Sequence, residues 1–479
     1  MYDNTAYVTS TIPFVNARPH VGFALELVQA DTLARYYRLL GRHVRFQTGT
    51  DEHAFKNVMA AREQGISTEQ FVNGNSKNFR HLCDELAVSH DRFIRTTEQA
   101  HKTAVRTFWK QLRPEDIYRK QYTGLYCIGC EDFYLEKDLV NGVCPDHGSA
   151  PVVVEEENYF FRLSAYQQRL ENLLISGKLS IVPESRYNEV LQFVRSGLRD
   201  ISVSRAAHRS GGWGISVPDD TSQVIYVWID ALINYLSGLG FGGGVKWQQV
   251  WNEDTDKIHV IGKNVWKFHA VYWPALLLSA GIQVPDKIVV HGFLTQNGQK
   301  ISKSLGNSID PGEYVRRFGS DAVRYYLLRY VRPFTDGDFS EERLSAAYDG
   351  LANGLGNLCS RLTALCECSE YGAFERPCDP RAPEGFHSAL ERFEFDTGLE
   401  LLEKDVHEVN QDIEHLAPWS LIRDGAGDQV RAAIAQWLGR LYDVVHWVGP
   451  FLPQTSAKIK SAVSAERVRK VEPLFPRSG

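Results

Sequence analysis

Two short motifs in this chain of 479 residues have the residue types needed to bind a nucleotide. The first, His20-Val21-Gly22-Phe23, follows a strand-like run and opens a helical pattern. Unpaired N–H groups and the helix dipole favour phosphate at such a position, and a glycine lets a nucleotide come close to the backbone. His20 can donate a hydrogen bond to phosphate. On its own, this motif fits a loop histidine before a helix equally well.

The second motif runs from Asn297 to Asn307 around the sequence Lys300-Ile301-Ser302-Lys303-Ser304. Two lysines three residues apart on a glycine-flanked loop make a cationic clamp, which suits the charge that develops on a pyrophosphate leaving group. A solvated Lys/Ser turn is the alternative. The pattern continues through Asp310 into a helical run, which favours the clamp. Together, the two motifs predict ATP chemistry with release of pyrophosphate.

A metal site is predicted by the spacing Cys127-x2-Cys130 followed, after thirteen intervening residues, by Cys144-x2-His147. Two close ligand pairs joined by a short loop can form a tetrahedral thiolate and imidazole site for zinc without a large core. One alternative is a knuckle that persists without metal. Another places Asp146, rather than His147, beside the ion.

The elements that must position these motifs alternate between strands and helices. A buried strand, a helix and a second strand form a βαβ unit, which predicts a parallel sheet. These three elements are predicted at residues 6–15, 22–40 and 44–48, and residues 66–113 are predicted to be mostly helical. Further buried strands are predicted at residues 224–228, 257–261 and 287–291. From about residue 345 the pattern is helical and predicts a bundle.

Composition and charge exclude several classes of protein. With 43% hydrophobic and 23% charged residues, the chain is expected to be globular and not disordered. Its net charge of −6 means that a nucleic-acid partner would need a local basic surface. No signal peptide and no membrane span are predicted, because the longest apolar stretch, residues 268–282, is too short. Eight cysteines fit thiols and metal ligation better than disulfides, so a cytoplasmic location is expected.

Over essentially its whole length the sequence resembles the bacterial methionyl-tRNA synthetases. The two motifs correspond to the HIGH and KMSKS signatures of class I synthetases, and the other matching stretches are residues 48–53, 227–235, 261–264 and 268–274. The resemblance implies that a methionine carboxylate attacks the α-phosphorus of ATP, which yields methionyl-adenylate and pyrophosphate. It also implies ATP with Mg²⁺ and structural Zn²⁺ as cofactors, and initiator and elongator methionine tRNAs as partners of a monomer. Catalysis would then consist of positioning and charge stabilisation.

The resemblance implies an α/β fold with a Rossmann-like parallel-sheet catalytic domain, an inserted zinc-knuckle domain and a C-terminal α-helical bundle. The two halves of the catalytic domain are expected at residues 1–115 and 226–300. The inserted connective domain, which resembles one that touches the tRNA acceptor end, is expected at residues 116–225. The KMSKS loop with the stem-contact region is expected at residues 301–345, and the helical anticodon-binding domain at residues 346–479.

Site residues are carried over from the family onto matching positions. The residues expected to bind ATP are His20, Gly22, Phe23, Arg205, Asn264, Lys300, Ser302 and Lys303. Those expected to be catalytic are His20, Gly22, Lys300 and Lys303. The amino-acid pocket is expected to consist of Ile12, Phe14, Asp51, Trp228, Ala231, Leu232, Tyr235, Val265 and His269. The resemblance assigns Cys127, Cys130, Cys144 and His147 to zinc, and Asn357, Arg361 and Trp419 to the tRNA anticodon.

The chemistry of these residues agrees with the roles that the resemblance gives them. Asp51 can pair with the substrate ammonium group, and an aromatic and aliphatic pocket suits a flexible, polarizable thioether. For Trp228 and Tyr235 considered alone, core packing is the alternative. Trp419 can act as a stacking platform for a splayed base, or as a core residue at a helix start.

The sequence departs from the family at five positions around the expected active site. Phe23 replaces the second histidine of HIGH, and one lost donor of this kind costs about 3 kcal/mol. Phe14 replaces a tyrosine, Ala54 and Phe55 replace a glycine and a glutamine, and Asn264 replaces an aspartate. One hypothesis is therefore a tRNA-charging enzyme, which includes the case of an inhibitor-resistant second copy. Another is a paralogue that activates a different amino acid or ligates it to a small-molecule amine, and a third is a non-catalytic tRNA-binding protein.

Overall fold

The chain folds into two compact units that alternate along the sequence. The computed structural model describes residues 5–145, 148–244, 246–301, 308–369, 371, 373–375, 377–424 and 427–476. The first unit comprises Met1–Pro19, Leu40–His81 and His90–His291, and the second comprises His20–Leu39, Leu82–Ser89 and Gly292–Gly479. No helix within the described ranges is long and apolar enough to cross a bilayer.

A six-stranded sheet forms the centre of the first unit, and every neighbouring pair in it is parallel. Its strands, in order across the sheet, are β3 (Arg92–Arg95), β2 (His43–Thr50), β1 (Thr5–Thr9), β12 (Thr255–Gly262), β13 (Lys287–His291) and β7 (Ser180–Val182). Runs of buried residues in β1, β12 and β13 fit a sheet covered on both faces. The direction in which the chain adds strands reverses between β1 and β12.

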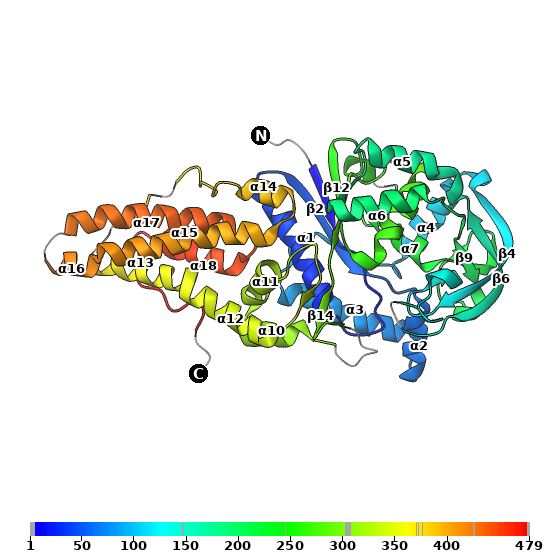
Figure 1. Cartoon of the computed structure of the whole chain (residues 1–479), viewed down its shortest axis with the longest axis horizontal. Coiled ribbons are helices and arrows are strands. Elements are labelled where there is room, and N and C mark those ends of the chain that lie inside the picture. Colours follow the sequence, from blue (N-terminus) through cyan, green and yellow to red (C-terminus); the bar gives the residue numbers. More distant parts are fainter. Residues whose placement is uncertain are drawn as a thin grey trace. The chain divides into compact units, whose positions relative to one another are not determined.

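Short helices and two antiparallel sheets complete the first unit (Figure 1). The long strands β4 (Ile117–Cys127) and β6 (Val152–Phe161) pair with each other, and β5 (Asp132–Tyr134) and β8 (Ile201–Ser202) flank them. A second sheet contains β10 (Ser216–Val217), β11 (Asp220–Ile225) and β9 (Ser204–Ala206). The α-helices that begin here are α2 (Phe55–Glu63), α3 (Thr68–Glu85), α4 (Gln99–Gln111), α5 (Gln167–Ile175), α6 (Glu184–Arg195), α7 (Val227–Leu232), α8 (Asn234–Ser237) and α9 (Trp273–Ser279).

The second unit contains α1 (Val21–Leu39) and an elongated helical bundle. In Figure 1 the long helices α15 (Phe395–Leu416) and α17 (Gly427–Val448) lie side by side with α13 (Asn357–Cys368). A small sheet joins β14 (Leu294–Gln296), β15 (Gln299–Lys300) and β16 (Gly337–Asp338). The other helices of the second unit are α10 (Pro311–Phe318), α11 (Ser320–Arg329), α12 (Glu341–Leu351), the π-helix η9 (Ala352–Gly356), α14 (Phe386–Glu391), α16 (Pro418–Arg423) and α18 (Pro453–Val463).

Within the second unit a buried ion pair joins α1 to α11. Arg324 lies 2.7 Å from Asp31, and both side chains are fully buried. The same guanidinium group donates to the carbonyl oxygens of Leu86, Pro450 and Phe451 at 2.7–3.1 Å. Because an unpaired buried charge is costly, replacing either member is expected to be strongly destabilising.

One predicted element needs correction, and one strand was missed. Residues 224–228 do not form one parallel strand: β11 ends at Ile225 and pairs antiparallel with β9, and α7 begins at Val227. A short apolar run does not distinguish a buried strand from a buried helix. Strand β3, which lies in a segment expected to be mostly helical, was not predicted. The α/β fold with a parallel sheet and helical C-terminal part is confirmed, whereas the domain boundaries stay predictions.

Candidate active site

The expected amino-acid pocket lies at the carboxyl ends of β1, β2 and β12. Phe14 follows β1, Asp51 follows β2, and the short 3₁₀-helix η6 (Lys263–Val265) follows β12. Phe14 and Asp51 form an isolated parallel bridge, and the Asp51 N–H donates to the carbonyl oxygen of Pro13 at 2.9 Å. Because the strand order reverses between β1 and β12, this edge is where α/β sheets open a crevice for ligands.

Aromatic rings gather at this edge of the sheet. The rings of Phe14 and Trp228 lie 5.3 Å apart between centroids, and Trp228 stacks on Phe268 at 4.1 Å and 11°. The Lys56 ammonium group lies 4.6 Å from the centroid of the Phe14 ring. Phe268 and Lys56 were not among the expected pocket residues. Phe268 could have been proposed, since it precedes His269 in a matching stretch.

Two of the expected pocket residues are joined by a buried hydrogen bond. Tyr235, on α8, lies with its hydroxyl 2.7 Å from Nε2 of His269, which belongs to the π-helix η7 (Phe268–Tyr272). The Nδ1 atom of His269 lies 3.0 Å from the carbonyl oxygen of Val265. The structure therefore brings three expected pocket residues together from α8, η7 and η6.

The other residues expected in the amino-acid and ATP sites differ in their exposure to solvent. Ala231 and Leu232 are buried on α7, Ile12 is half-buried beside β1, and Asn264 is exposed on η6. A side-chain amide of Asn234 donates to the Ala231 carbonyl at 2.6 Å and fixes the junction of α7 and α8. The pocket residues thus lie on helices and loops that buried contacts hold in place.

Asp51 is a buried carboxylate with one oxygen that lacks a partner. Its Oδ1 accepts a hydrogen bond from the His53 N–H at 3.2 Å, whereas Oδ2 is buried and makes no hydrogen bond. Burial, together with the neighbouring Asp230, Glu131 and Glu52 carboxylates, raises the pKa of Asp51 well above its usual range. A cation that reaches Oδ2 would offset these unfavourable charges.

Arg205 is enclosed by aromatic rings. Its guanidinium group lies 3.9 Å from the ring centroid of Tyr226 and 4.5 Å from that of Phe133, and it donates to the Ser202 hydroxyl at 3.0 Å. The Nε and Nη2 atoms are buried without a partner. Arg205 borders a cavity of about 40 Å³ that His53 also lines. Its expected role near the nucleotide stays a prediction.

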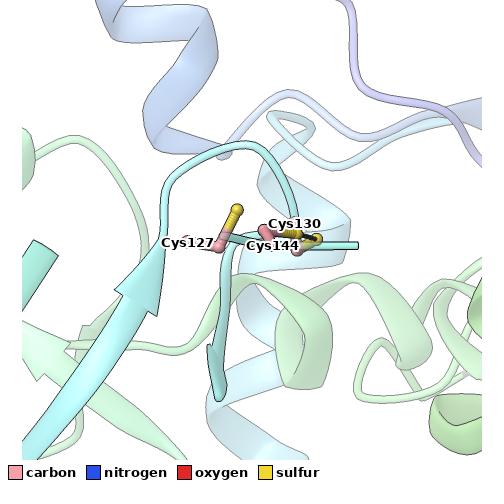
Figure 2. A group of neighbouring side chains, drawn as sticks. All are labelled: Cys127, Cys130 and Cys144. Carbon is pink, nitrogen blue, oxygen red and sulfur yellow. Dashed lines mark hydrogen bonds between the residues drawn. The ribbon is translucent and has the colours of Figure 1, made fainter. Parts of the chain in front are cut away.

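Three cysteines converge where β4 ends. The side chains of Cys127, Cys130 and Cys144 lie together in Figure 2, with their sulfur atoms all within 4.8 Å of one another. The Cys130 and Cys144 sulfurs are 3.5 Å apart. Three clustered sulfur donors fit a tetrahedral zinc ion that takes a fourth ligand. His147, the expected fourth ligand, lies outside the described residues.

Carbonyl groups of the loop between Cys127 and Cys130 accept hydrogen bonds from side chains beside Phe14 and Phe268. The Trp228 indole N–H donates to the Cys130 carbonyl at 3.2 Å, and the Lys56 ammonium group donates to the Gly129 carbonyl at 2.9 Å. The backbone N–H of Lys56 also donates to Glu131 at 3.0 Å. The loop that carries two of the expected metal ligands is therefore attached to the aromatic residues at this edge of the sheet.

The two nucleotide motifs both belong to the second unit. The Val21 N–H at the start of α1 donates to the carbonyl oxygen of Ile309 at 3.1 Å, so the chain after the lysine motif adjoins the histidine motif. The Gly22 N–H donates to Nδ1 of His20 at 3.1 Å, and a Cβ atom on Gly22 would lie 2.9 Å from that ring. These two N–H groups, expected to be unpaired, are bonded within the protein.

Phe23 is buried in the first turn of α1. Of the lysine motif, Ser302 and Lys303 lie outside the described residues. The backbone of Lys300 ends strand β15. The expected roles of all four residues, and those of His20 and Gly22, stay predictions.

The three residues expected to contact tRNA gather in the helical bundle. Arg361 lies 3.2 Å from Oδ1 of Asn410 and 3.3 Å from Glu414, and Asn357 lies 3.4 Å from the same Asn410 oxygen. The Arg361 guanidinium group is 6.0 Å from the ring centroid of Trp419, which is 51% exposed. Asn410 was not expected, because it lies 53 residues from Asn357 in the sequence.

Comparison with known proteins gives consistent matches. The family model described as tRNA synthetases class I (M) matches residues 6–150 and 135–363. The methionine–tRNA ligase of Thermotoga maritima is 38% identical, over 98% of this chain and 76% of its own length. The methionine–tRNA ligase of Brucella melitensis biotype 1 is 38% identical, over 96% of this chain and 92% of its own length.

A solved structure matches almost the whole chain. The methionyl-tRNA synthetase of Mycobacterium tuberculosis in complex with methionyl-adenylate has a TM-score of 0.90 and 34% sequence identity. The match covers 99% of this chain and 100% of that chain. The apo form of the same enzyme matches with a TM-score of 0.83.

Proposed function

Because the chain belongs to the class I methionyl-tRNA synthetase family, we propose that it activates methionine with ATP and transfers the methionyl group to tRNA. The methionine carboxylate would attack the α-phosphorus of ATP, and the bond to the leaving pyrophosphate would break. Initiator and elongator methionine tRNAs are the proposed acceptors. Monomeric state and cytoplasmic location stay predictions.

The observation that carries this proposal is the pocket around Asp51. A buried carboxylate with one unbonded oxygen is suited to an ammonium group, because ion pairing would lower the cost of burying its charge. Next to it, Phe14, Trp228 and Phe268 present ring faces and edges. Such rings favour a polarizable thioether through sulfur–aromatic contacts.

For ATP, we propose that His20 and Gly22 contact phosphate oxygens and that Lys300 and Lys303 stabilise the departing pyrophosphate, which Mg²⁺ accompanies. The Nδ1 atom of His20 accepts from the Gly22 N–H, so the ring proton is on Nε2, and we assign the proposed phosphate contact to that nitrogen. Asn264, Ser302, Phe23 and Arg205 complete the proposed ATP site. No protein nucleophile is required, because the amino acid supplies the attacking oxygen.

For zinc, we propose that Cys127, Cys130, Cys144 and His147 hold one ion with a structural role. Zinc bound to thiolates stabilises a small loop that lacks a hydrophobic core. Because the Cys130 carbonyl accepts from Trp228, a correctly folded loop also supports that side chain.

Pyrophosphate exchange tests the proposed function. The chain would be assayed with each of the amino acids in turn, with and without methionine-accepting tRNA. Methionine-dependent exchange together with charging of that tRNA is the expected result. Exchange with another amino acid alone, or no exchange at all, would contradict the proposal.

A second candidate is a paralogue that activates another amino acid or passes it to a small-molecule amine. The environment of Phe14 favours it, because a ring without a hydroxyl stands beside Asp51 and is covered by the Lys56 ammonium group. An inhibitor-resistant second copy would share this altered environment. Exchange with a non-methionine acid, or product formation with an amine instead of tRNA, would support this candidate.

A further inference from the structure

A chain of buried hydrogen bonds runs from the Asp51 loop through α7 to α4. Nδ1 of His53 lies 2.6 Å from Oδ2 of Asp230, and Oδ1 of Asp230 lies 2.7 Å from Nε2 of His101. The Nδ1 atom of His101 lies 2.7 Å from the Ser237 hydroxyl. The exposed fraction of each of these four side chains is 6% or less. Because burying polar and charged side chains is costly, we expect this network to serve the structure or the chemistry of the protein.

The buried carboxylates around this hydrogen-bond network differ in the number of partners that each has. Four acidic side chains are buried in this part of the first unit, namely Asp51, Glu52, Glu131 and Asp230. Two nitrogen atoms of Arg95 bind Glu52 at 2.7 and 2.9 Å. The backbone N–H of Lys56 and the Tyr126 hydroxyl bind Glu131 at 3.0 and 2.5 Å.

Asp230 has two imidazole partners, whereas no cationic side chain among the described residues bonds to Asp51. Of the four carboxylates, Asp51 is therefore the one that lacks a protein donor for its second oxygen. The missing partner is of the kind that a substrate ammonium group would supply.

Asp51 and Asp230 are coupled through their charges. Burial disfavours the Asp230 carboxylate, but His53 and His101 outweigh it and lower the pKa of Asp230 to about 2. Burial and then the Asp230 charge raise the pKa of Asp51. The two hydrogen-bonded rings therefore keep Asp230 ionised, and its negative charge disfavours a second ionised carboxylate at Asp51.

We propose that Asp230 and His101 are positioning residues of the amino-acid site, which act through His53 to hold Asp51 oriented for the substrate ammonium group. Asp230 also lies on α7, the helix of Trp228, so the same chain ties the charged and aromatic parts of the pocket together. His101 is fully buried and acts only through Asp230. This inference rests on the proposed function.

The other charged groups that face this region would stay unchanged in a test of the proposal. They are Glu52 with Arg95, and Glu131 with Lys56 and Arg205. Substitutions at His101 and Asp230 change the surroundings of Asp51 and leave these charged groups and their partners in place.

Two substitutions with different expected effects test the inference. His101→Gln keeps a donor near the position of Nε2 but removes the ring that bonds to Asp230, so the chain that orients Asp51 should loosen. Asp230→Asn keeps polar contacts to both rings but removes a negative charge, so Asp51 should ionise at lower pH. The readout is KM for methionine and kcat in pyrophosphate exchange of the full chain, measured between about pH 6 and 9.

For His101→Gln, we expect KM for methionine at neutral pH to rise about tenfold, because Asp51 is held less firmly. For Asp230→Asn, the pH midpoint of KM should move down. In both variants kcat should change less than KM, because the ammonium group is remote from the reacting phosphorus. His43→Gln, at an exposed histidine on β2, is the matched control and should leave the profile unchanged.

An unchanged KM in the His101→Gln variant, or an unchanged midpoint in the Asp230→Asn variant, would overturn the inference. Ser237→Ala is a milder variant in case the others unfold. It removes a hydroxyl that lies 2.7 Å from Nδ1 of His101 and should raise KM by a smaller factor, and an unchanged KM would also overturn the inference. If wild-type exchange required another amino acid, the proposed function would fail, but the same changes would still be expected with that acid because it also carries an ammonium group.

Discussion

The buried Tyr235 hydroxyl donates a hydrogen bond of 2.7 Å to Nε2 of His269. The donor is identified by the other side of the ring, where Nδ1 lies 3.0 Å from the Val265 carbonyl, a group that can only accept. Tyr235 also stacks on His259 at 4.1 Å. Burial, with His269 and Lys257 nearby, lowers the pKa of His259 well below its usual range. A neutral His259 and a defined His269 tautomer therefore hold the tyrosine.

Tyr235→Phe is expected to weaken methionine binding with little effect on the chemical step. The substitution removes one buried hydrogen bond between neutral groups and leaves the His269 Nε2 acceptor unpaired. Such a loss is worth about 1 kcal/mol, so KM for methionine should rise about fivefold. Steady-state pyrophosphate exchange would measure it. Tyr118→Phe, which removes a hydroxyl that bonds to Asp200 at 2.8 Å, is the control, and equal effects of both variants would contradict a role in the pocket.

Phe23→His is expected to raise the rate of pyrophosphate exchange with methionine. Phe23 stands in the first turn of α1, beside Gly22, at the position of the second histidine of the family motif. An added donor to ATP in the transition state could increase kcat by up to about 100-fold. Phe23→Leu also removes the ring but offers no donor, so it should give no increase. A fall in rate with histidine would mean that the site is adapted to phenylalanine.

Cys130→Ser is expected to abolish zinc binding and loosen the loop that supports Trp228. The purified wild-type chain should contain about one zinc per molecule, measured by elemental analysis. The variant should contain almost none and should be cleaved faster by protease around residues 127–147. Cys368→Ser, at an exposed thiol, is the matched control and should retain the metal. Equal zinc content in both variants would show that the three sulfur atoms do not hold the ion.

Apolar periodicity and residue spacing predicted the parts of the fold that depend on local sequence. The strands around Val8, Phe46, Val260 and Val289 and helix α1 follow this pattern, and the structure confirms them. The segment 224–228 was misassigned because a buried helix and a buried strand share an apolar sequence. Only tertiary contacts decide between them.

The contacts of the candidate site also fall into two groups: those that local sequence predicts, and those that depend on tertiary packing. The spacing of Cys127, Cys130 and Cys144 predicted their convergence, because the three lie on one short hairpin-like segment. His101 gave no signal, since it meets Asp230 from 129 residues away on a helix without a motif. Asn410 reaches Arg361 across 49 residues. Contacts of this kind depend on how helices pack, which a single sequence does not encode locally.

Arg361→Gln is expected to impair charging of tRNA without changing pyrophosphate exchange. Its guanidinium group bonds to Asn410 and Glu414 and lies 6.0 Å from the Trp419 ring centroid, so it joins the polar and stacking parts of the proposed anticodon site. Losing a charged contact to RNA should raise KM for tRNA about tenfold or more, while KM for methionine stays constant. Aminoacylation and exchange assays on the same preparation would separate the two effects. Arg423→Gln, at an arginine side chain that is 77% exposed, controls for a general loss of positive charge. If both arginine variants reduced charging equally, non-specific attraction would explain the effect, and the assigned role of Arg361 in reading the anticodon would be wrong.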